Sequence, residues 1–147
     1  MKPLRILALL GLAAAGGCLP NHPPAPEEQA IERFDDGEKL FAEGKFTDAA
    51  IEFEYALKHR PRWKAPYARL GLCREKTGRD DDAIAVYERL LRVDGADEDA
   101  LRGLGRIYGR RDDAPHALEY YRRLKALFPD DRSLDAEIAR LEALRKP

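Results

Sequence analysis

Residues that commonly form catalytic and metal-binding sites are scarce in this sequence. It has two cysteines and three histidines in 147 residues, and it lacks a glycine-rich phosphate loop, an HExxH pair and a CxxC motif. His22 has no partner at metal-ligand spacing, and neither His59 nor His116 has a serine, cysteine or aspartate partner in an evident site. The sequence therefore favours neither an enzyme nor a protein that binds a metal, a cofactor or a small-molecule substrate.

An excess of charge of either sign is also missing. The 26 basic and 27 acidic residues give a formal net charge of −1, and both kinds are mixed along the chain. No overall positive field would draw the protein to nucleic acid, so that partner is disfavoured. Charged residues make up 36% of the chain and hydrophobic residues 44%, a mixture that suits helices with one wet and one buried face.

A long apolar run occurs only at the N-terminus. Lys2 and Arg5 precede an apolar stretch, residues 6–15, that is too short for a membrane-spanning helix of about 20 residues. This arrangement is typical of a secretory signal peptide. Residues 1–17 followed by Cys18 resemble the signal of a bacterial lipoprotein, although Ala15 stands where that motif usually has leucine. The resemblance implies that Cys18 becomes the mature N-terminus and carries lipid.

The segment after the cysteine predicts a tether. Residues 18–29 contain four prolines, which disfavour a helix, and an extended chain over residues 19–29 would reach on the order of 34 Å. Several acyl chains on Cys18 would anchor the protein stably to a membrane. Leu19, rather than aspartate, follows the cysteine, which resembles the outer-membrane sorting pattern of proteobacterial lipoproteins. The alternative is a soluble secreted protein that is cleaved near Ala15.

Three stretches align without a gap at a period of 34 residues, namely 30–63, 64–97 and 98–131. Each stretch has glycine at its position 8, alanine at position 20, an aromatic residue at position 24, and proline or glycine at position 32. These residues are Gly37, Gly71 and Gly105; Ala49, Ala83 and Ala117; Phe53, Tyr87 and Tyr121; and Pro61, Gly95 and Pro129.

The pattern resembles the tetratricopeptide repeat family and implies an all-α, right-handed superhelix. Each repeat would pair a helix A with an antiparallel helix B. The glycine would let position 20 pack closely, and the aromatic residue would fill the gap between neighbouring helix pairs. Gly44 and Gly78 are expected to end two A helices, and Asp80 and Asp81 to cap the second B helix. An apolar stripe predicts a capping helix within residues 132–147, formed by Leu134, Ile138, Leu141 and Leu144.

The resemblance also implies a partner-binding groove, because A helices line the concave face in this family. Arg102, Arg106 and Arg110 are four residues apart and share a helix face. They could hold the carboxylates of an acidic partner, or form a solvated face that Asp99, Glu75 and the acids of the tether neutralise. The groove residues that we single out are Phe34, Glu38, Phe41, Leu72, Glu75, Arg102, Arg106 and Arg110.

Several of the apolar candidates have alternative interpretations. Phe34 and Phe41 either contact a partner or pack on the N-terminal arm or the second repeat. Trp63 is either an exposed anchor for a partner or a cover for the loop between repeats. Cys73 is expected to be a small buried thiol.

We therefore expect a scaffold that binds another protein or peptide. The bacterial cell envelope is the expected location, with a lipid anchor in the outer membrane facing the periplasm and a role in assembling an envelope complex. The alternative is a soluble periplasmic or secreted subunit of a larger complex. Some cytosolic family members hold chaperone C-termini with a lysine and asparagine clamp, which Phe34, Glu38 and Arg69 do not reproduce.

Overall fold

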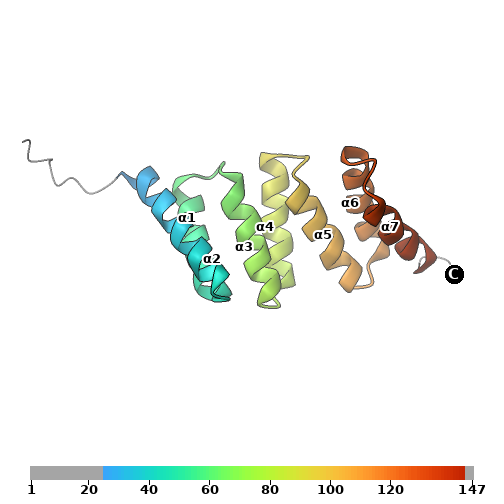
Figure 1. The fold of residues 1–147 in the computed structure, drawn as a ribbon, viewed down its shortest axis with the longest axis horizontal. Helices are drawn as coiled ribbons and strands as arrows, with labels where there is room; N and C mark the ends of the chain where they lie inside the picture. Colours follow the sequence, from blue (N-terminus) through green and yellow to red (C-terminus); the bar gives the residue numbers. More distant parts are fainter. Residues whose placement is uncertain (1–24, 145–147) are drawn as a thin grey trace, which may run out of the picture.

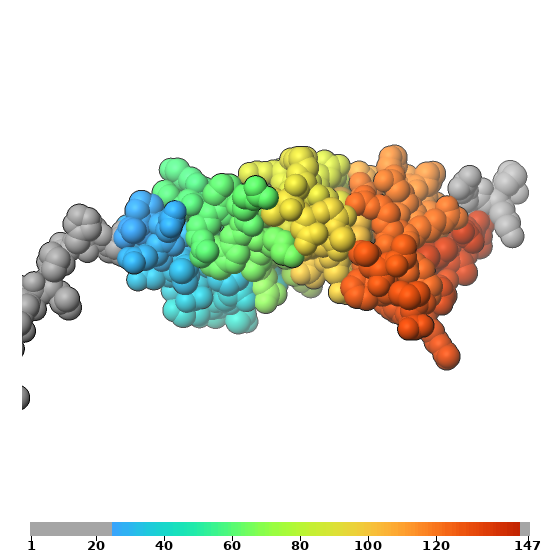
Figure 2. All heavy atoms as spheres, turned by 90° about the horizontal axis from the view of Figure 1, so that it is seen from above, coloured from blue at the N-terminus to red at the C-terminus, as the bar shows by residue number. Residues whose placement is uncertain are grey.

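The described part of the chain, residues 25–144 of a computed structural model, contains seven helices and no strand. Consecutive helices pack as antiparallel pairs, and the pairs stack in chain order from one end of an elongated molecule to the other (Figures 1 and 2). The all-α prediction is confirmed. The helices are α1 (Pro26–Ala42), α2 (Phe46–His59), α3 (Lys64–Lys76), α4 (Asp80–Val93), α5 (Glu98–Arg110), α6 (Ala114–Leu127) and α7 (Arg132–Leu144).

The first helix begins earlier than the sequence predicts. It starts at Pro26 rather than at Ala30, so the extended tether predicted up to Gln29 is wrong for residues 26–29. Proline is tolerated in the first turn of a helix, because the N–H that it lacks would have no partner within the helix. The predicted signal peptide, Cys18 and the tether up to residue 24 lie outside the described residues.

Glycine and aromatic side chains organise the core. A Cβ atom built on Gly37 would lie 2.6 Å from the ring of Phe53, and one built on Gly105 would lie 2.9 Å from the ring of Tyr121. The glycine at position 8 thus makes room for the aromatic residue at position 24, rather than chiefly for the alanine at position 20. The ring of Tyr87 lies against two glycines, Gly71 at position 8 in α3 and Gly103 at another position in α5. Tyr87 therefore fills the gap between two helix pairs, as the sequence predicts.

The turns between paired helices agree with the sequence only in part. Gly44 and Gly78 have positive φ angles of 77° and 72°, as expected of residues that end a helix in the left-handed region. The predicted caps Asp80 and Asp81 are wrong, because they lie inside the first turn of α4 and no side chain caps that helix. Asp113 instead caps α6, by accepting a hydrogen bond from the backbone N–H of His116.

The last helix packs on α6 through part of its apolar stripe. Leu134 and Leu141 are buried, whereas Leu144 at the end of α7 is 58% exposed. Within the described residues, no helix is long and apolar enough to cross a membrane.

Candidate functional site

The A helices α3 and α5 lie side by side and form a hollow of about 460 Å³ between them. Four of the eight predicted groove residues lie in this hollow, together with Lys76. The lining residues are Leu72, Glu75 and Lys76 from α3, and Arg106 and Arg110 from α5. We call this hollow the α3–α5 groove.

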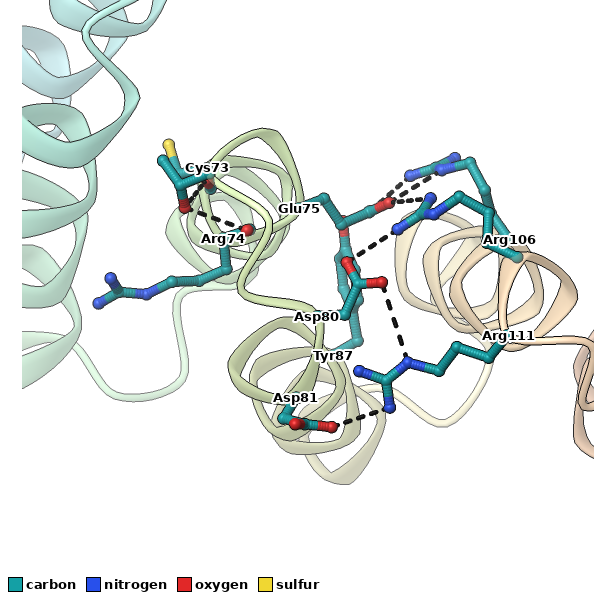
Figure 3. A network of polar contacts seen from close by, with 10 residues as sticks. Cys73, Arg74, Glu75, Asp80, Asp81, Tyr87, Arg106 and Arg111 are labelled. Carbon is teal, nitrogen blue, oxygen red and sulfur yellow. Dashed lines mark hydrogen bonds and ion pairs between the residues drawn. The ribbon is translucent and has the colours of Figure 1, made fainter.

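Glu75 is the centre of the groove. Arg106 donates two hydrogen bonds to it, from Nη2 to Oε1 at 2.6 Å and from Nε to Oε2 at 3.1 Å. Arg110 donates to Oε2 at 3.0 Å, and the hydroxyl of Tyr87 donates to Oε1 at 2.8 Å. Figure 3 shows the Glu75 side chain reaching from α3 toward Arg106 of α5. One carboxylate therefore connects the buried aromatic core to two cations at the surface.

The surroundings of Glu75 favour its charged form. Its side chain is only 7% exposed, and this burial by itself would raise the pKa of the carboxyl group. Hydrogen bonds from Arg106, Tyr87 and Arg110 outweigh burial, so the pKa of Glu75 lies below its usual value. Burial, followed by the negative charge of Glu75, raises the pKa of Tyr87, which therefore remains a proton donor to the carboxylate.

A chain of ion pairs extends the network toward the turn after α3. Arg110 contacts Asp80 at 2.9 Å, and Arg111 contacts Asp81 at 2.8 Å (Figure 3). The aspartates that the sequence assigned to helix capping thus join α4 to the end of α5. The sequence does not predict these ion pairs, because Asp80 and Asp81 lie 30 residues before Arg110 and Arg111.

Arg102 lies apart from the groove. Its guanidinium contacts Glu98 at 2.9 Å and Asp131 at 3.4 Å. Each of the three arginines of the predicted basic stripe is therefore paired with acids. The geometry favours the alternative of a neutralised face, with Glu75, Asp80, Glu98 and Asp131 as the acids rather than Asp99.

The aromatic residues of the first repeat pack within the fold. Phe34 lies between Phe53 and Trp63, with ring centroids 5.5 Å and 4.6 Å away. Trp63 thus packs on Phe34 at the turn between α2 and α3, as its interpretation as a loop cover predicts, and it remains half-exposed in a hollow beside that turn. Phe41 contacts Phe46 at 5.2 Å, and the guanidinium of Arg69 lies 5.2 Å from its ring centre.

Arg69 also forms an ion pair with Glu38 at 2.7 Å. Two of the three residues at the positions of the chaperone clamp are thereby engaged with each other. Phe34, Glu38 and Phe41 are each half-buried, so they do not form a free aromatic patch.

Cys73 and the side chains that could bind a metal form no evident site in the described residues. Cys73 is fully buried, as the sequence predicts, and this burial raises the pKa of its thiol to about 11. In residues 25–144 no three histidine, cysteine, aspartate or glutamate side chains come together in a way that could hold a metal ion.

Comparison with known proteins identifies the repeat. Two family models, each described as tetratricopeptide repeat, match residues 40–107 and residues 99–131. No curated protein matches the chain.

Solved structures share the fold, and 137 of their chains match. The first TPR of Spaghetti (RPAP3), bound to the HSP90 peptide SRMEEVD, has a TM-score of 0.75 and 16% identity, over 82% of this chain and 96% of that one. The Arabidopsis OM64 TPR domain has a TM-score of 0.74 and 13% identity, over 81% of this chain and 98% of that one. Identities this low show a common fold alone. The two family matches, which together span residues 40–131, show that the chain belongs to the tetratricopeptide repeat family.

Proposed function

We propose that the protein is a non-catalytic adapter that binds a segment of another protein in the α3–α5 groove. The observation that carries this proposal is the preformed hollow with an apolar floor, Leu72, beside cations held in place by Glu75. A groove whose side chains are already fixed loses less conformational entropy when a partner binds. A family member with this fold holds an HSP90 peptide, which supports a peptide or protein as the partner.

Glu75 and Asp80 neutralise much of the positive charge in the groove, and the charge that remains, chiefly on Lys76, favours a carbonyl-rich segment with few carboxylates. Lys76, Arg106 and Arg110 contribute three positive charges to the lining, against one negative charge from Glu75. Arg106 uses Nε and Nη2 to hold Glu75, and its other nitrogen remains to donate to a partner. Asp80 reduces the positive charge at Arg110, so we expect recognition of one or two carboxylates rather than of a long acidic run.

The binding face is testable by site-specific photocrosslinking in cells. A photoreactive residue placed at Lys76, which is exposed in the groove, should capture a discrete partner, whereas the same residue at the exposed Glu119 of α6 should not. Leu72→Asp should weaken the capture at Lys76, because it places a charge on the apolar floor. Equal capture at Lys76 and Glu119, or no effect of Leu72→Asp, would contradict the groove assignment.

We propose further that the adapter is held in the bacterial cell envelope by lipid on Cys18, at the outer membrane and facing the periplasm, where it assists assembly of an envelope complex. The short apolar leader and the small residues before Cys18 support this proposal. The alternative is a soluble periplasmic or secreted subunit. Metabolic labelling with a lipid precursor separates the two, since Cys18→Ser should abolish labelling and release the protein from membranes. Unchanged labelling and fractionation would refute the anchor.

A further inference from the structure

Arginines without an acidic partner gather at one edge of the molecule, away from the α3–α5 groove. Most arginines in residues 25–144 form an ion pair with an acidic side chain, and those for which the structure shows none are Arg60, Arg62, Arg89, Arg92, Arg123 and Arg132. The first four line two adjoining hollows near the turn between α2 and α3. Such a gathering of unneutralised cations is absent from the predicted groove.

The two hollows share Arg62 and differ in character. The arginine hollow, of about 310 Å³, is lined by Arg62, Tyr67, Arg89, Arg92 and Val93, and none of these residues is acidic. The tryptophan hollow, of about 810 Å³, has apolar walls from Pro61, Trp63 and Ala65. Its polar lining carries one acid, Glu27, against the cations Arg60, Arg62 and Lys64. Both hollows lie beside the α2–α3 turn. This turn is at the upper edge of the molecule in Figure 1 and faces the viewer in Figure 2.

Aromatic rings, rather than acids, position two of these arginines, Arg89 and Arg60. The guanidinium of Arg89 lies 5.4 Å from the ring centre of Tyr67 and donates a hydrogen bond of 3.4 Å to its hydroxyl. The Tyr67 hydroxyl in turn donates to the carbonyl oxygen of Pro61 at 3.0 Å. Arg60 lies 4.6 Å from the ring centre of Trp63. A guanidinium held on an aromatic face keeps its in-plane N–H groups available for a carboxylate.

A structural role explains only part of this arrangement. Arg92 lies in the last turn of α4, where a cation is favoured by the negative end of the helix dipole. Arg62 lies in a turn, outside any helix, and the dipole gives no reason for it. Neighbouring Lys64, by contrast, contacts Asp94 at 2.7 Å. Like charges brought together at Arg62, Arg89 and Arg92 repel one another, and an anionic ligand would remove that cost.

We propose that these two hollows form a second recognition site, which binds an acidic peptide segment of a partner protein. Two or more carboxylates of the segment lie against Arg62, Arg89 and Arg92, and an adjacent apolar side chain lies on Trp63 and Pro61. Paired N–H groups of arginine suit planar carboxylates, and the adjoining apolar hollow suits a side chain from the same segment. A flat lipid surface would use the cations but would leave the tryptophan hollow empty.

The site is distinct from the α3–α5 groove and does not depend on its occupant or on lipid at Cys18. The groove residues Leu72, Lys76 and Arg106 line neither hollow. One adapter could therefore hold two different partners. It could also hold two segments of one partner, and the overall affinity would then exceed that of either contact alone.

The test uses the purified full-length chain and fluorescein-labelled peptides with three neighbouring acids. One peptide carries a leucine beside the acids, a second has glycine there, and a third replaces the acids by their amides. We expect the leucine peptide to bind more tightly than the amide peptide by about tenfold or more, with affinity falling as salt rises. Trp63 is the only tryptophan, so its emission should change with the leucine peptide and much less with the glycine peptide.

Variants with matched charge assign the contact. Arg89→Gln/Arg92→Gln should weaken the leucine peptide about tenfold or more, whereas Arg123→Gln/Arg132→Gln, which removes two other arginines without acidic partners, should change affinity less than about twofold. Circular dichroism of both variants checks that the helices remain. A Lys76→Gln variant separates the two sites, because it alters the α3–α5 groove alone.

Each contrary outcome overturns the proposal. Equal weakening by both double variants would mean that net charge alone draws the peptide. Loss of binding only in Lys76→Gln would place the contact in the groove. Absence of peptide binding, with Arg89/Arg92-dependent binding to vesicles that contain phosphatidylglycerol, would assign the edge to a lipid surface instead. Absence of both would leave the arginines without a ligand role and refute the site.

Discussion

Alanine substitutions at two glycines of α5 should have opposite effects on stability. A Cβ atom at Gly103 would fall well inside the contact distance of the Tyr87 ring, whereas one at Gly109 would meet only Arg140 Nη2 at 3.6 Å and Glu137 Oε1 at 3.9 Å. Both glycines lie in the same helix. Gly103 lies in the middle of the helix and Gly109 in its last turn. Alanine is favoured over glycine at both positions, less so in the last turn, and the surroundings of the added methyl group decide the sign.

The magnitudes follow from these contacts. Replacing a helical glycine by alanine stabilises a protein by roughly 0.5–1 kcal/mol, because glycine loses more backbone freedom on folding. Gly109→Ala should show part of that gain, because Gly109 lies in the last turn of α5. Forcing a methyl group into a packed core costs about 1–3 kcal/mol, so Gly103→Ala should lose roughly 1–2 kcal/mol in total.

Tyr87 has little room to yield. It is 1% exposed, its ring also packs on Gly71, and its hydroxyl donates to Glu75 at 2.8 Å. A shift of the ring away from a Cβ atom at position 103 would therefore disturb the carboxylate that holds Arg106. The cost of Gly103→Ala reaches from the core to the α3–α5 groove.

Urea unfolding followed by far-ultraviolet circular dichroism measures both variants. Tyr87→Leu, which removes the ring, should abolish most of the additional cost of Gly103→Ala when the two are combined in a double-mutant cycle. The reasoning is refuted if Gly103→Ala is as stable as Gly109→Ala, or if the cost of Gly103→Ala persists in the Tyr87→Leu background.

Three further predictions concern the charged network, the thiol and the helix caps. Glu75→Gln should lower stability by roughly 1–2 kcal/mol at pH 7, since it weakens hydrogen bonds to charged arginines that are themselves partly exposed. Because the pKa of Glu75 is lowered in the folded state, the stability that its charge contributes is present above the normal pKa of 4.5 and is lost as the pH falls below that value. The difference in stability from wild type should therefore shrink in acid, and a constant difference would contradict this account. In a Cys18→Ser background, Cys73, with its pKa raised to about 11 by burial, should react with a thiol reagent only as the protein unfolds, and rapid labelling in native buffer would contradict its burial. Asp113→Ala should cost about 0.5–2 kcal/mol of stability, because it removes the N-cap of α6. Asp81→Ala should cost less than about 0.5 kcal/mol, because the Asp81 side chain is 91% exposed in its pair with Arg111. Thermal unfolding of the two variants compares these losses, and equal losses would count against the cap assignment.

The period of 34 residues predicts the helices well, because each repeat places the same types of residue at the same positions of a helix pair. The left-handed glycines, the aromatic residue at position 24 and the buried thiol at Cys73 follow directly from it. The start of α1 does not, since Pro26 is compatible with both an extended chain and a first helical turn, and only the contacts of the fold decide between them. The same holds for Asp80 and Asp81, because an acid before a helix can cap it or pair with a cation elsewhere.

The groove shows where the reasoning from sequence falls short. The repeat register places Arg106 and Arg110 on the same face as Glu75 of the preceding repeat, and neighbouring repeats in such folds are in contact. An acid near a pair of bases across that interface was a signal for the ion pairs now seen. The sequence does name Glu75 as an acid that could neutralise these arginines, but spacing within one helix does not choose between that arrangement and a partner's carboxylates, and it does not predict the pairing of Arg110 with Asp80.

The arginines of the further site were overlooked for the converse reason. Arg62, Arg89 and Arg92 lie in a turn and on a B helix, positions to which the family resemblance assigns no partner, and nothing in their spacing connects them. The antiparallel pairing of α3 with α4 brings the end of α4 back to the turn before α3 (Figure 1). Tyr67 then supports Arg89 beside Arg62. A cation becomes available to a partner when the fold gives it no acid nearby, and that property belongs to the packed pairs rather than to any one helix.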